Sequence, residues 1–276
     1  MVFMPNLQPH PALRPYVRHY LLLHASMAGI PPEQRIKPMP PDADQSLYFY
    51  PRSEVKVITN RTSETRTSAR SIFVARQTSR INIGFGNDHL IIQVCFRPGF
   101  LYQFLGKAPF HTWRDEELSA EDLTDRTMQE LNERLGEETD YGRMIALIET
   151  WLLNRCARLS IDVQPIDRVI AALRQSEMPR SLDWLADQAC LSSRQLERKF
   201  QERMGMSPKF YARIARFDRA FKLKTQQPQL DWLDVAYQCG YFDFSHLMRD
   251  FRQFAEVTPS LLLAQEMASP DWWRTG

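Results

Sequence analysis

The sequence has few of the residues that build disulfide scaffolds, metal centres or membrane spans. Its four cysteines, Cys95, Cys156, Cys190 and Cys239, form no CxxC pair, which argues against a disulfide framework or a zinc site and fits a reducing cytoplasm. The six histidines show no HxH or HxxxH spacing, so no metal cluster is expected. The longest apolar runs, "YLLLH" and "HLIIQVCF", are far shorter than the roughly 20 residues of a membrane helix. We therefore expect a cytoplasmic protein without a cofactor and without a membrane partner.

No GxSxG, P-loop or dinucleotide fingerprint occurs either, and we do not expect an enzyme. What the chain does have is length and apolar content, with 276 residues of which 43% are hydrophobic and 11% aromatic. This is enough for sizeable cores, and two domains are expected at this length. The net charge of +2 decides little, because charge acts through its local distribution.

The N-terminal part has the pattern of short β-strands. The segments "QSLYFY", "VKVIT" and "SIFVA" are β-branched or aromatic, and "RINIGFGNDHLIIQVCF" predicts two strands around a turn. Residues 17–26 fit a helix or a strand by periodicity, and their aromatic and apolar content favours a strand. Five prolines predict a loop over residues 28–45. Several short strands joined by turns indicate a small barrel or sandwich.

Near Pro98 the period changes to that of helices. Residues 117–138 and 140–159 are each predicted as one amphipathic helix. The second helix carries a stripe of large side chains on one side, which are Met144, Leu147, Ile148, Trp151, Leu152 and Arg155. A long apolar stripe beyond a barrel suits a dimer interface, so we expect a homodimer formed through residues 119–158.

Residues 160–165 have the pattern of a linker, and the chain beyond them is helical throughout. The sequence thus predicts an α+β protein in three parts. These are a β-rich regulatory domain over residues 1–112, a helical dimerisation region over 113–159, and an all-α domain over 160–276.

The C-terminal part contains an internal duplication. Leu196 and Leu247 are 51 residues apart, as are Phe200 and Phe251, and the Ser-Pro pair that starts at Ser207 has a Thr-Pro counterpart at the same spacing. Each copy has the pattern of a helix, a tight turn and a second helix.

The second helix of the first copy has one apolar and one charged face. Ser192 or Ser193 supplies its N-cap, and Leu196, Phe200 and Met204 are predicted to be buried. The side chains that then point outward are Arg194, Gln195, Glu197, Arg198 and Lys199. A helix held in this way presents its N-terminal residues to a DNA major groove, where arginine pairs with guanine O6 and N7.

Between the copies, residues 207–224 predict a helix with Ser207 as its cap and Pro208 in its first turn. Such a helix is about 27 Å long and separates the two units by nearly one DNA turn of about 34 Å. Residues 191–224 hold ten basic and three acidic side chains, a local charge of +7. A patch of this kind contacts phosphates and releases counterions.

The stretches "LSSRQLERKFQERMGMSPKFYARIARF" and "VAYQCGYFDFSHLMRDFRQFAEVTPSLL" strongly resemble the AraC/XylS family of bacterial transcription regulators. The shared features are two helix-turn-helix units, each closed by Ser/Thr-Pro and joined by a helix, over residues 165–265. The resemblance implies that both recognition helices read double-stranded promoter DNA in adjacent major grooves, with RNA polymerase as a further partner. It also implies a cupin-like N-terminal barrel, on the stretches "LRPYVRHYLLLH" and "VCFRPGFLYQFLG".

Carried over by position, the resemblance assigns DNA-binding roles to both recognition helices. In the first unit the base-reading candidates are Arg194, Glu197 and Arg198, with Gln195 near them and Lys199 at the phosphate edge. Glu197 could equally pair with a neighbouring arginine. In the second unit the matching positions are Phe244, Ser245, Met248 and Arg249, with His246 nearby.

The second unit departs from the family pattern. Phe244 and Met248 cannot hydrogen-bond to base edges, although they can touch a thymine methyl. We therefore expect the first unit to carry most base readout, and the second to position the protein through Ser245 and Arg249.

Two turn positions depart from the pattern as well. Glu256 stands where a glycine is expected before "VTP", and Cys190 replaces the small turn residue of the first unit. Cys190 and Cys239 both lie near turns, where we expect buried structural cysteines rather than a redox sensor.

Polar and aromatic side chains on the predicted strands are candidates for binding an effector. They are Tyr48, Tyr50, Arg76, Gln93 and Arg97. The aromatic ones serve equally well in a core, because large rings are usually buried.

These observations predict a sequence-specific DNA-binding transcription regulator, modulated by a small-molecule effector or by dimerisation through its N-terminal domain. The alternative is a cupin-like barrel enzyme or ligand-binding protein with an appended DNA-tethering domain. Titratable residues clustered inside the barrel would favour the enzyme, and an apolar pocket with one or two polar anchors would favour the regulator. A third reading is a regulator that has lost its effector and responds to its own abundance or to a protein partner.

Overall fold

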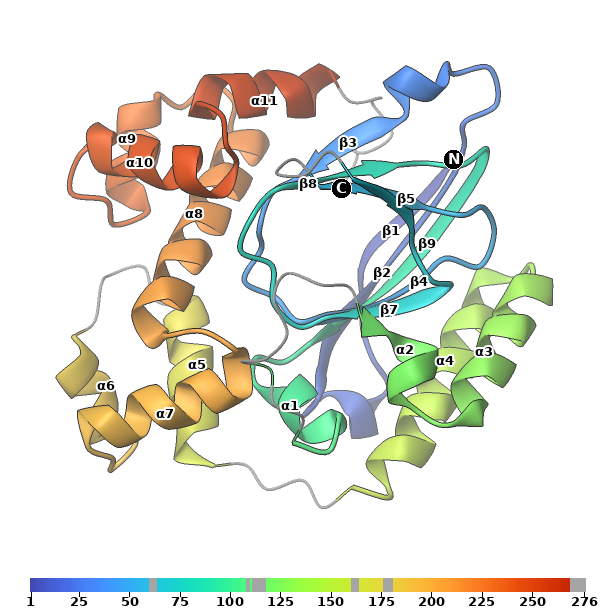
Figure 1. The fold of residues 1–276 in the computed structure, drawn as a ribbon, viewed down its shortest axis with the longest axis horizontal. Helices are drawn as coiled ribbons and strands as arrows, with labels where there is room; N and C mark the ends of the chain where they lie inside the picture. The colour runs from blue at the N-terminus through green and yellow to red at the C-terminus, as the bar shows by residue number, and fades with distance from the viewer. Residues whose placement is uncertain (60–63, 108–109, 111–117, 160–163, 176–180, 269–276) are drawn as a thin grey trace.

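The computed structural model describes residues 1–276 except 60–63, 108–109, 111–117, 160–163, 176–180 and 269–276. Strands occupy the N-terminal part and helices the C-terminal part, side by side (Figure 1). The predicted boundaries at 112/113 and 159/160 fall on or beside residues outside the described ranges, so the three-part division stays a prediction. None of the helices described has the length and apolar character needed to cross a bilayer.

The strands form two antiparallel sheets that face each other as a cupin-like barrel (Figure 1). The larger sheet has the order β1-β2-β9-β4-β7-β10 and the smaller β3-β8-β5-β6. The strands are β1 Val2–Leu7, β2 Val17–Ser26, β3 Ile36–Met39, β4 Ser46–Phe49, β5 Lys56–Thr59, β6 Thr65–Thr67, β7 Ser71–Val74, β8 Ile81–Gly84, β9 Asp88–Phe96 and β10 Leu118–Ser119. Short 3₁₀ turns η1 Pro11–Leu13 and η2 Pro32–Gln34 lie between them. The predicted α+β class with an N-terminal barrel is confirmed.

Strand β2 shows why residues 17–26 were ambiguous between helix and strand. Both faces of β2 are apolar, because Tyr20 and Leu22 pack into the core under the helices while Leu21 and Leu23 face the barrel interior. A strand covered on both faces loses the alternation that identifies a half-exposed one. The prediction of a strand there is confirmed, and β2 pairs with β9 along its whole length.

The prediction of an uninterrupted loop over residues 28–45 was wrong. Residues Ile36–Met39 form β3, which pairs with β8 and includes the buried Pro38. Because β3 is an edge strand, proline costs it no hydrogen bond within the sheet. The number of prolines in this segment therefore did not predict β3, because an edge strand can accommodate Pro38.

The prediction of one helix over 117–138 was also wrong. The segment forms β10, then α2 (Ala120–Leu123), then α3 (Arg126–Glu137). Asp125 interrupts it as the N-cap of α3, and its carboxylate accepts a hydrogen bond from the Thr127 amide at 3.0 Å. Helix α4 (Tyr141–Cys156) follows as predicted.

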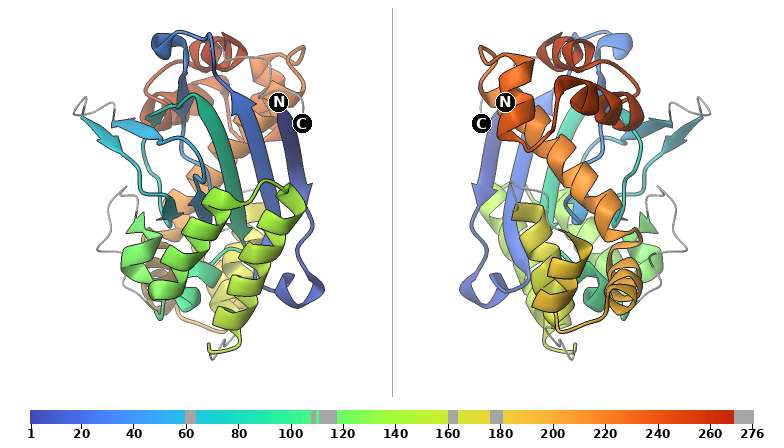
Figure 2. Two further views of the ribbon diagram at one scale, coloured as in Figure 1. Left: turned by 90° about the vertical axis from the view of Figure 1, so that its right-hand side faces the viewer. Right: turned by 90° about the vertical axis from the view of Figure 1, so that its left-hand side faces the viewer.

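The apolar stripe of α4 is used inside the chain. Met144, Ile148, Trp151 and Leu152 are buried in one core with the six-stranded sheet, and α3 and α4 lie across the outer face of the long strands (Figure 2). The stripe is thus not an open surface for a second copy, which removes the reason for placing a dimer interface there. The homodimer itself stays a prediction.

The C-terminal helices form the two predicted helix-turn-helix units joined by a linker helix. They are α5 Pro165–Gln175, α6 Leu182–Gln188, α7 Ser193–Met204, α8 Pro208–Gln226, α9 Trp232–Gln238, α10 Phe244–Phe254 and α11 Pro259–Ala268. Leu196 and Phe200, predicted to be buried, are fully buried, and so are their counterparts in the second copy, Leu247 and Phe251. The 19-residue α8 runs diagonally between α6–α7 and α9–α11 (Figure 2).

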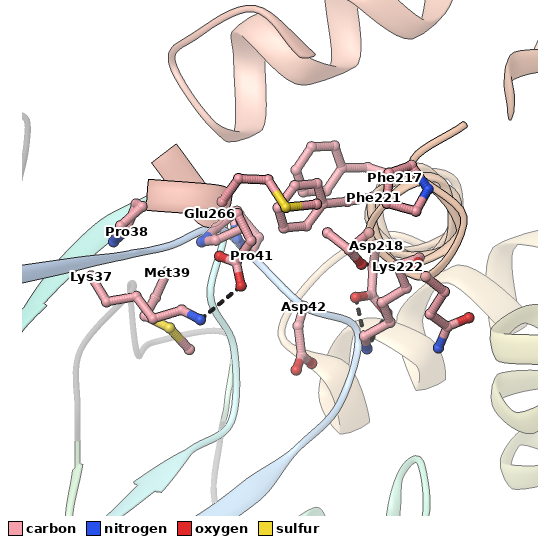
Figure 3. Close-up of a pocket in the computed structure, with 15 residues that line it drawn as sticks. Lys37, Pro38, Met39, Pro41, Asp42, Phe217, Asp218, Phe221, Lys222 and Glu266 are labelled. Atoms are coloured by element: carbon pink, nitrogen blue, oxygen red, sulfur yellow. Dashed lines mark hydrogen bonds and ion pairs between the residues drawn. The ribbon is translucent and has the colours of Figure 1, made fainter. Parts of the chain in front are cut away.

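The barrel touches both helix-turn-helix units. Residues between β7 and β8 meet the end of α7, where Arg76 donates to the Gly205 carbonyl at 2.9 Å. At the other end of α8, Lys37 of β3 and Glu266 of α11 point toward each other and form a buried ion pair at 2.8 Å (Figure 3). The barrel therefore fixes both units relative to itself.

Candidate nucleic-acid interface and barrel cavity

Recognition helix α7 begins with a complete capping box. The Ser192 hydroxyl accepts from the Gln195 amide at 3.3 Å, and Gln195 Oε1 accepts from the Ser192 amide at 3.0 Å. Ser192 is thus the cap, and the alternative, Ser193, donates its hydroxyl to Asp183 at 2.7 Å. Gln195 is exposed but its side-chain oxygen is occupied by the cap.

The charged face of α7 is open to solvent. Arg194, Glu197 and Arg198 are exposed, and Arg198 makes a surface ion pair with Glu202 at 3.2 Å. Such pairs are weak enough to exchange for a base or a phosphate. Glu197 has no ion pair within the described residues, so the alternative of an arginine partner is not realised. Lys199 leans toward the start of α5 and lies 3.4 Å from Gln164, at the edge of the helix.

Recognition helix α10 is capped by Asp243, whose carboxylate accepts from the His246 amide at 2.7 Å. Ser245 and Arg249 are exposed, Phe244 is 38% exposed and Met248 is half-buried. The polar and apolar side chains predicted for this unit therefore do reach the surface.

His246 is an exception among the residues predicted to bind DNA. Its ring packs edge-on against Tyr241 at 5.5 Å, and Nε2 lies 3.3 Å from the guanidinium of Arg216 on α8. Burial and the charge of Arg216 lower the pKa of His246. The structure thus places this ring against the linker helix rather than outward.

Sequence reasoning missed an apolar surface next to α10. Phe242, just before the cap, is 86% exposed, Tyr237 on α9 is 59% exposed and Leu233 is 43% exposed. The closely spaced aromatic residues in "GYFDF" could have indicated this surface, because a small helical core cannot bury three aromatic rings so close together in sequence.

The basic patch predicted over 191–224 is smaller than its composition indicated. Several of its cations hold the helices together and are not available to phosphates. Arg213 and Arg216 pair with the fully buried Asp250 at 2.7 and 3.4 Å. Arg203 is 5% exposed and pairs with Asp167 at 3.2 Å.

A cavity of about 460 Å³ fills the barrel. Both sheets contribute to its walls, which are mostly apolar and aromatic; among them are Leu21, Met39, Ile72, Val74, Ile83 and Phe85. The predicted effector residues Tyr48, Tyr50 and Gln93 line it. Gln93 donates to the Tyr48 hydroxyl at 3.0 Å, which leaves a small polar centre in an apolar space.

The other two predicted effector residues lie elsewhere. Arg76 points to the end of α7, as described above. Arg97 donates Nε to the Arg14 carbonyl at 2.6 Å on the outside of the barrel. Both follow the last residue of a strand, β7 or β9, where the alternation of inward and outward side chains no longer applies.

His89 is the cavity residue that sequence reasoning missed. It is 1% exposed, and its ring centroid lies 4.2 Å from that of Phe85 at a tilt of 37°. Neither ring nitrogen has a hydrogen-bond partner within the described residues. Burial, with the nearby His24, lowers the pKa of His89 to about 4, so the ring is neutral. A buried ring with an unsatisfied donor and acceptor fits an additional binding partner in the cavity.

Charged residues close the cavity at the end nearest the C-terminal helices. Burial and the charge of Asp44 raise the pKa of Asp42 to about 7. Asp42, Met39 and Lys222 also line the groove of about 720 Å³ between β3 and helices α8 and α11 (Figure 3). The groove and the cavity therefore adjoin at Asp42. Among the described residues no group of three His, Cys, Asp or Glu side chains is arranged to hold a metal ion.

Two family models match the chain. Residues 6–119 match a domain of unknown function (DUF6597), and residues 185–265 match a helix-turn-helix domain. The first covers much of the barrel and gives no activity. The second covers α7, α8, α9 and α10, the helices that carry the interface described above.

Curated relatives match over the same C-terminal part. An HTH-type transcriptional regulator of Haemophilus influenzae is 31% identical over 93 residues, which are 33% of this chain and 30% of that protein. The HTH-type transcriptional regulator GbdR of Pseudomonas aeruginosa is 35% identical over 98 residues, 35% of this chain and 26% of that protein. The match thus spans less than a third of either relative.

Two solved structures match the chain with low TM-scores. ToxT from Vibrio cholerae has a TM-score of 0.49 and 10% identity over 88% of this chain and 98% of that chain. An AraC-type regulator from Chromobacterium violaceum has a TM-score of 0.35 and 25% identity over 41% of this chain and 95% of that chain. At these scores the likenesses carry no weight. The sequence motifs and the helix-turn-helix match together place the C-terminal domain of this chain in the AraC/XylS family.

Proposed function

We propose that the chain is a sequence-specific transcription regulator that binds double-stranded promoter DNA with α7 and α10. The observation that carries this proposal is the arrangement of α7 and α10, which are joined by α8. Each of the two helices is capped, buries an apolar face and exposes the opposite face to solvent. A helix of 19 residues is about 28 Å long, which suits two recognition helices in successive major grooves.

The two units have different roles in this proposal. Arg194, Glu197 and Arg198 read bases, because they are exposed at the start and middle of α7. On α10, Arg249 contacts phosphate while Phe244 and Met248 touch thymine methyls. RNA polymerase and a second copy of the chain are further proposed partners, in the cytoplasm. The relatives are transcriptional regulators by name, which supports RNA polymerase as a partner.

The barrel cavity binds the effector in this proposal. Its apolar walls select a compact apolar molecule, and the neutral His89 with the Gln93–Tyr48 pair offers a donor and acceptors to one hydroxyl or amide group. Because the cavity adjoins the groove between β3 and α8, its occupation can bias how the two units are held.

The DNA interface is tested with a double variant, Arg194→Gln with Arg198→Gln, and a remote control, Arg126→Gln with Arg143→Gln. Both change the charge equally, and the control residues lie on α3 and α4. We expect the first variant to lose affinity for a selected duplex by at least tenfold while the control binds as wild type. Equal losses in both would show that only net charge matters.

A second candidate function, chemistry on a bound molecule, has one observation in its favour. Asp42 opens on the cavity and its pKa of about 7, raised by burial and by Asp44, is that of a general base. The other carboxylate at this end, Asp44, is held by Arg18 at 2.5 Å and Arg174 at 3.0 Å, so it stays an ion-pair partner. An effector recovered unchanged after incubation with the protein would exclude this function for that molecule.

A further inference from the structure

A second hollow lies outside the barrel, at its seam with the C-terminal helices. This seam cleft has a volume of about 500 Å³ and is bounded by the start of β2, the turn after β9, α1 (Phe100–Phe104), α5 and α8. None of its described lining residues belongs to α6, α7, α9 or α10. The cleft is therefore separate from the DNA interface proposed above.

Arginine dominates the lining of the seam cleft. The arginines are Arg18, Arg97, Arg168, Arg174 and Arg219. Two of them have carboxylate partners, since Asp44 accepts from both Arg18 and Arg174 and Asp218 also pairs with Arg174 at 3.1 Å. The carboxylate among the described lining residues, Asp167, is paired with Arg203 at 3.2 Å. Three arginines therefore lack a counter-charge in the part of the chain that the structure describes.

These three arginines come from three different elements. Arg97 follows β9 and donates Nε to the Arg14 carbonyl, and its terminal nitrogens have no hydrogen-bond partner among the residues that the structure describes. Arg168 lies on α5 and Arg219 on α8, with no acidic residue three or four positions away on either helix. Like charges gathered at one cleft repel each other unless an anion lies between them.

An aromatic surface lies beside the arginines. The Tyr16 ring stacks on Phe100 with centroids 4.8 Å apart and an angle of 24° between planes. Phe100 is buried and covers one face of Tyr16, and Tyr16 is half-buried and lines the cleft. A flat ring can stack on such a surface while its charged group reaches a guanidinium.

The turn that carries Arg97 is held close to α5. Gly99 has φ +83°, and a Cβ at this position would lie 3.1 Å from Asp167 Oδ1 and 3.2 Å from Ile170 Cδ1. Glycine suits this position because a side chain would be strained at this φ and would crowd α5. The turn that carries Arg97 therefore lies against α5, which carries Arg168, and both arginines line the cleft. The cleft is thus preorganised by the "RPG" stretch, and preorganisation lowers the entropic cost of binding.

We propose that the seam cleft binds a small organic anion that carries a flat ring, with its phosphate or carboxylate oxygens on Arg97, Arg168 and Arg219 and its ring on Tyr16. Guanidinium groups bind both kinds of oxyanion through paired hydrogen bonds. Because the barrel, α5 and α8 all contribute, the bound anion joins the barrel to the helix-turn-helix domain. This site is distinct from the barrel cavity, and Arg18 and Arg174 stand between the two.

The test is a fluorescence titration of the full chain with 2-naphthyl phosphate and 2-naphthoate, compared with neutral 2-naphthol and with inorganic phosphate as competitor. We expect at least one anion to bind tenfold or more tightly than naphthol, and to weaken as salt is raised. Whichever anion binds more tightly identifies phosphate or carboxylate as the preferred group. Arg168→Gln and Arg219→Gln should each weaken binding about tenfold or more, and Tyr16→Ala should weaken both anions alike.

Two control variants make the outcome decisive. Arg126→Gln removes one charge from a side chain that is 87% exposed on α3 and should leave the affinity unchanged. Gln93→Leu alters the barrel cavity and should also leave it unchanged. The proposal is overturned if neither anion binds better than naphthol, or if binding responds to Gln93→Leu and not to the arginine variants. It is likewise overturned if Arg168→Gln and Arg219→Gln weaken DNA binding and spare the probe, which would assign both arginines to DNA phosphates.

Discussion

Arg174 of α5 donates two hydrogen bonds to the Asp44 carboxylate, Nε to Oδ1 at 3.0 Å and Nη2 to Oδ2 at 3.1 Å. This bidentate pair joins the helix-turn-helix domain to the segment that leads into β4. Burial alone would raise the pKa of Asp44, but the hydrogen bonds and charges of Arg174 and Arg18 hold it well below its ordinary value. The seam therefore depends on an ionised carboxylate that is only 3% exposed.

Substitution of Arg174 measures how much this ion pair contributes to the free energy of unfolding. Arg174→Ala leaves a buried charge with Arg18 as its remaining partner, so we expect the free energy of unfolding to fall by about 3 kcal/mol. The matched control is Arg168→Ala, an exposed arginine on the same helix, with an expected change within about 0.5 kcal/mol. Urea denaturation measures both, and equal effects would contradict the role given to the pair.

Two residues in left-handed conformation offer a stabilising change. Cys190 has φ 51° and Glu256 has φ 60°, while the corresponding positions of the other unit hold glycines. The expectation that Cys190 is buried was wrong, because it is exposed in this turn, whereas Cys239 is buried as expected. A non-glycine residue in this region costs about 1 kcal/mol or more, so Cys190→Gly and Glu256→Gly should each raise the free energy of unfolding by about that amount. Thermal unfolding at fixed pH measures the gain.

Gly205 is the matched control for those two variants. It also has positive φ, at 70°, but an added Cβ would lie 2.8 Å from the Phe110 carbonyl oxygen. Gly205→Ala should therefore destabilise the protein, both through the backbone and by displacing the barrel contact. If Gly205→Ala were more stable than wild type, the close approach of Gly205 to the Phe110 carbonyl oxygen would be refuted.

Because of Asp42, the stability of the folded protein should decrease as pH rises toward neutrality. Burial and Asp44 raise its pKa from 3.8 to about 7, so the folded chain keeps a proton that the unfolded chain releases in this window. The stabilising contribution is complete below pH 3.8 and is lost as pH rises through about 7. Asp42→Asn cannot ionise, so its stability relative to wild type should increase from the lower to the upper end of this window. A difference that is constant with pH would show that the pKa of Asp42 is not raised.

The two recognition helices should respond differently to substitution. Arg198→Ala should change which bases are preferred in one half of the binding site and cost about 1–3 kcal/mol on the preferred sequence. Arg249→Gln should weaken binding about equally on all sequences and reduce the salt slope by about one. Binding isotherms at several salt concentrations measure both, and altered base preference in Arg249→Gln would overturn the proposed division of roles.

The sequence predicted the elements whose signals are local. Ser192, Ser207 and the Ser/Thr-Pro pairs mark helix starts, and the 51-residue repeat placed both helix-turn-helix units. It could not predict Ile36–Met39 as a strand, because the tolerance of Pro38 depends on β3 being at the edge of its sheet. The break at Asp125 was missed because the helical period continues on both sides of the cap.

In the candidate sites, too, the sequence predicted local features and missed those that depend on contacts between distant residues. Exposure of Arg194 and Arg198 followed from helix periodicity, whereas the burial of Arg203 depends on Asp167 and on the Tyr102 ring, 5.2 Å from its guanidinium. Such partners lie far away in sequence, and charge counting cannot reveal them. His89 was missed because which face of β9 it occupies depends on strand register.

The most direct test is selection of genomic DNA fragments by the full chain at fixed salt, repeated with the Arg194→Gln, Arg198→Gln double variant. We predict enrichment of one motif with two contacted segments about one helical turn apart. In the variant, base preference should be lost in one of these segments. Binding that depends only on salt and enriches no sequence would contradict the assignment of α7 and α10 as recognition helices.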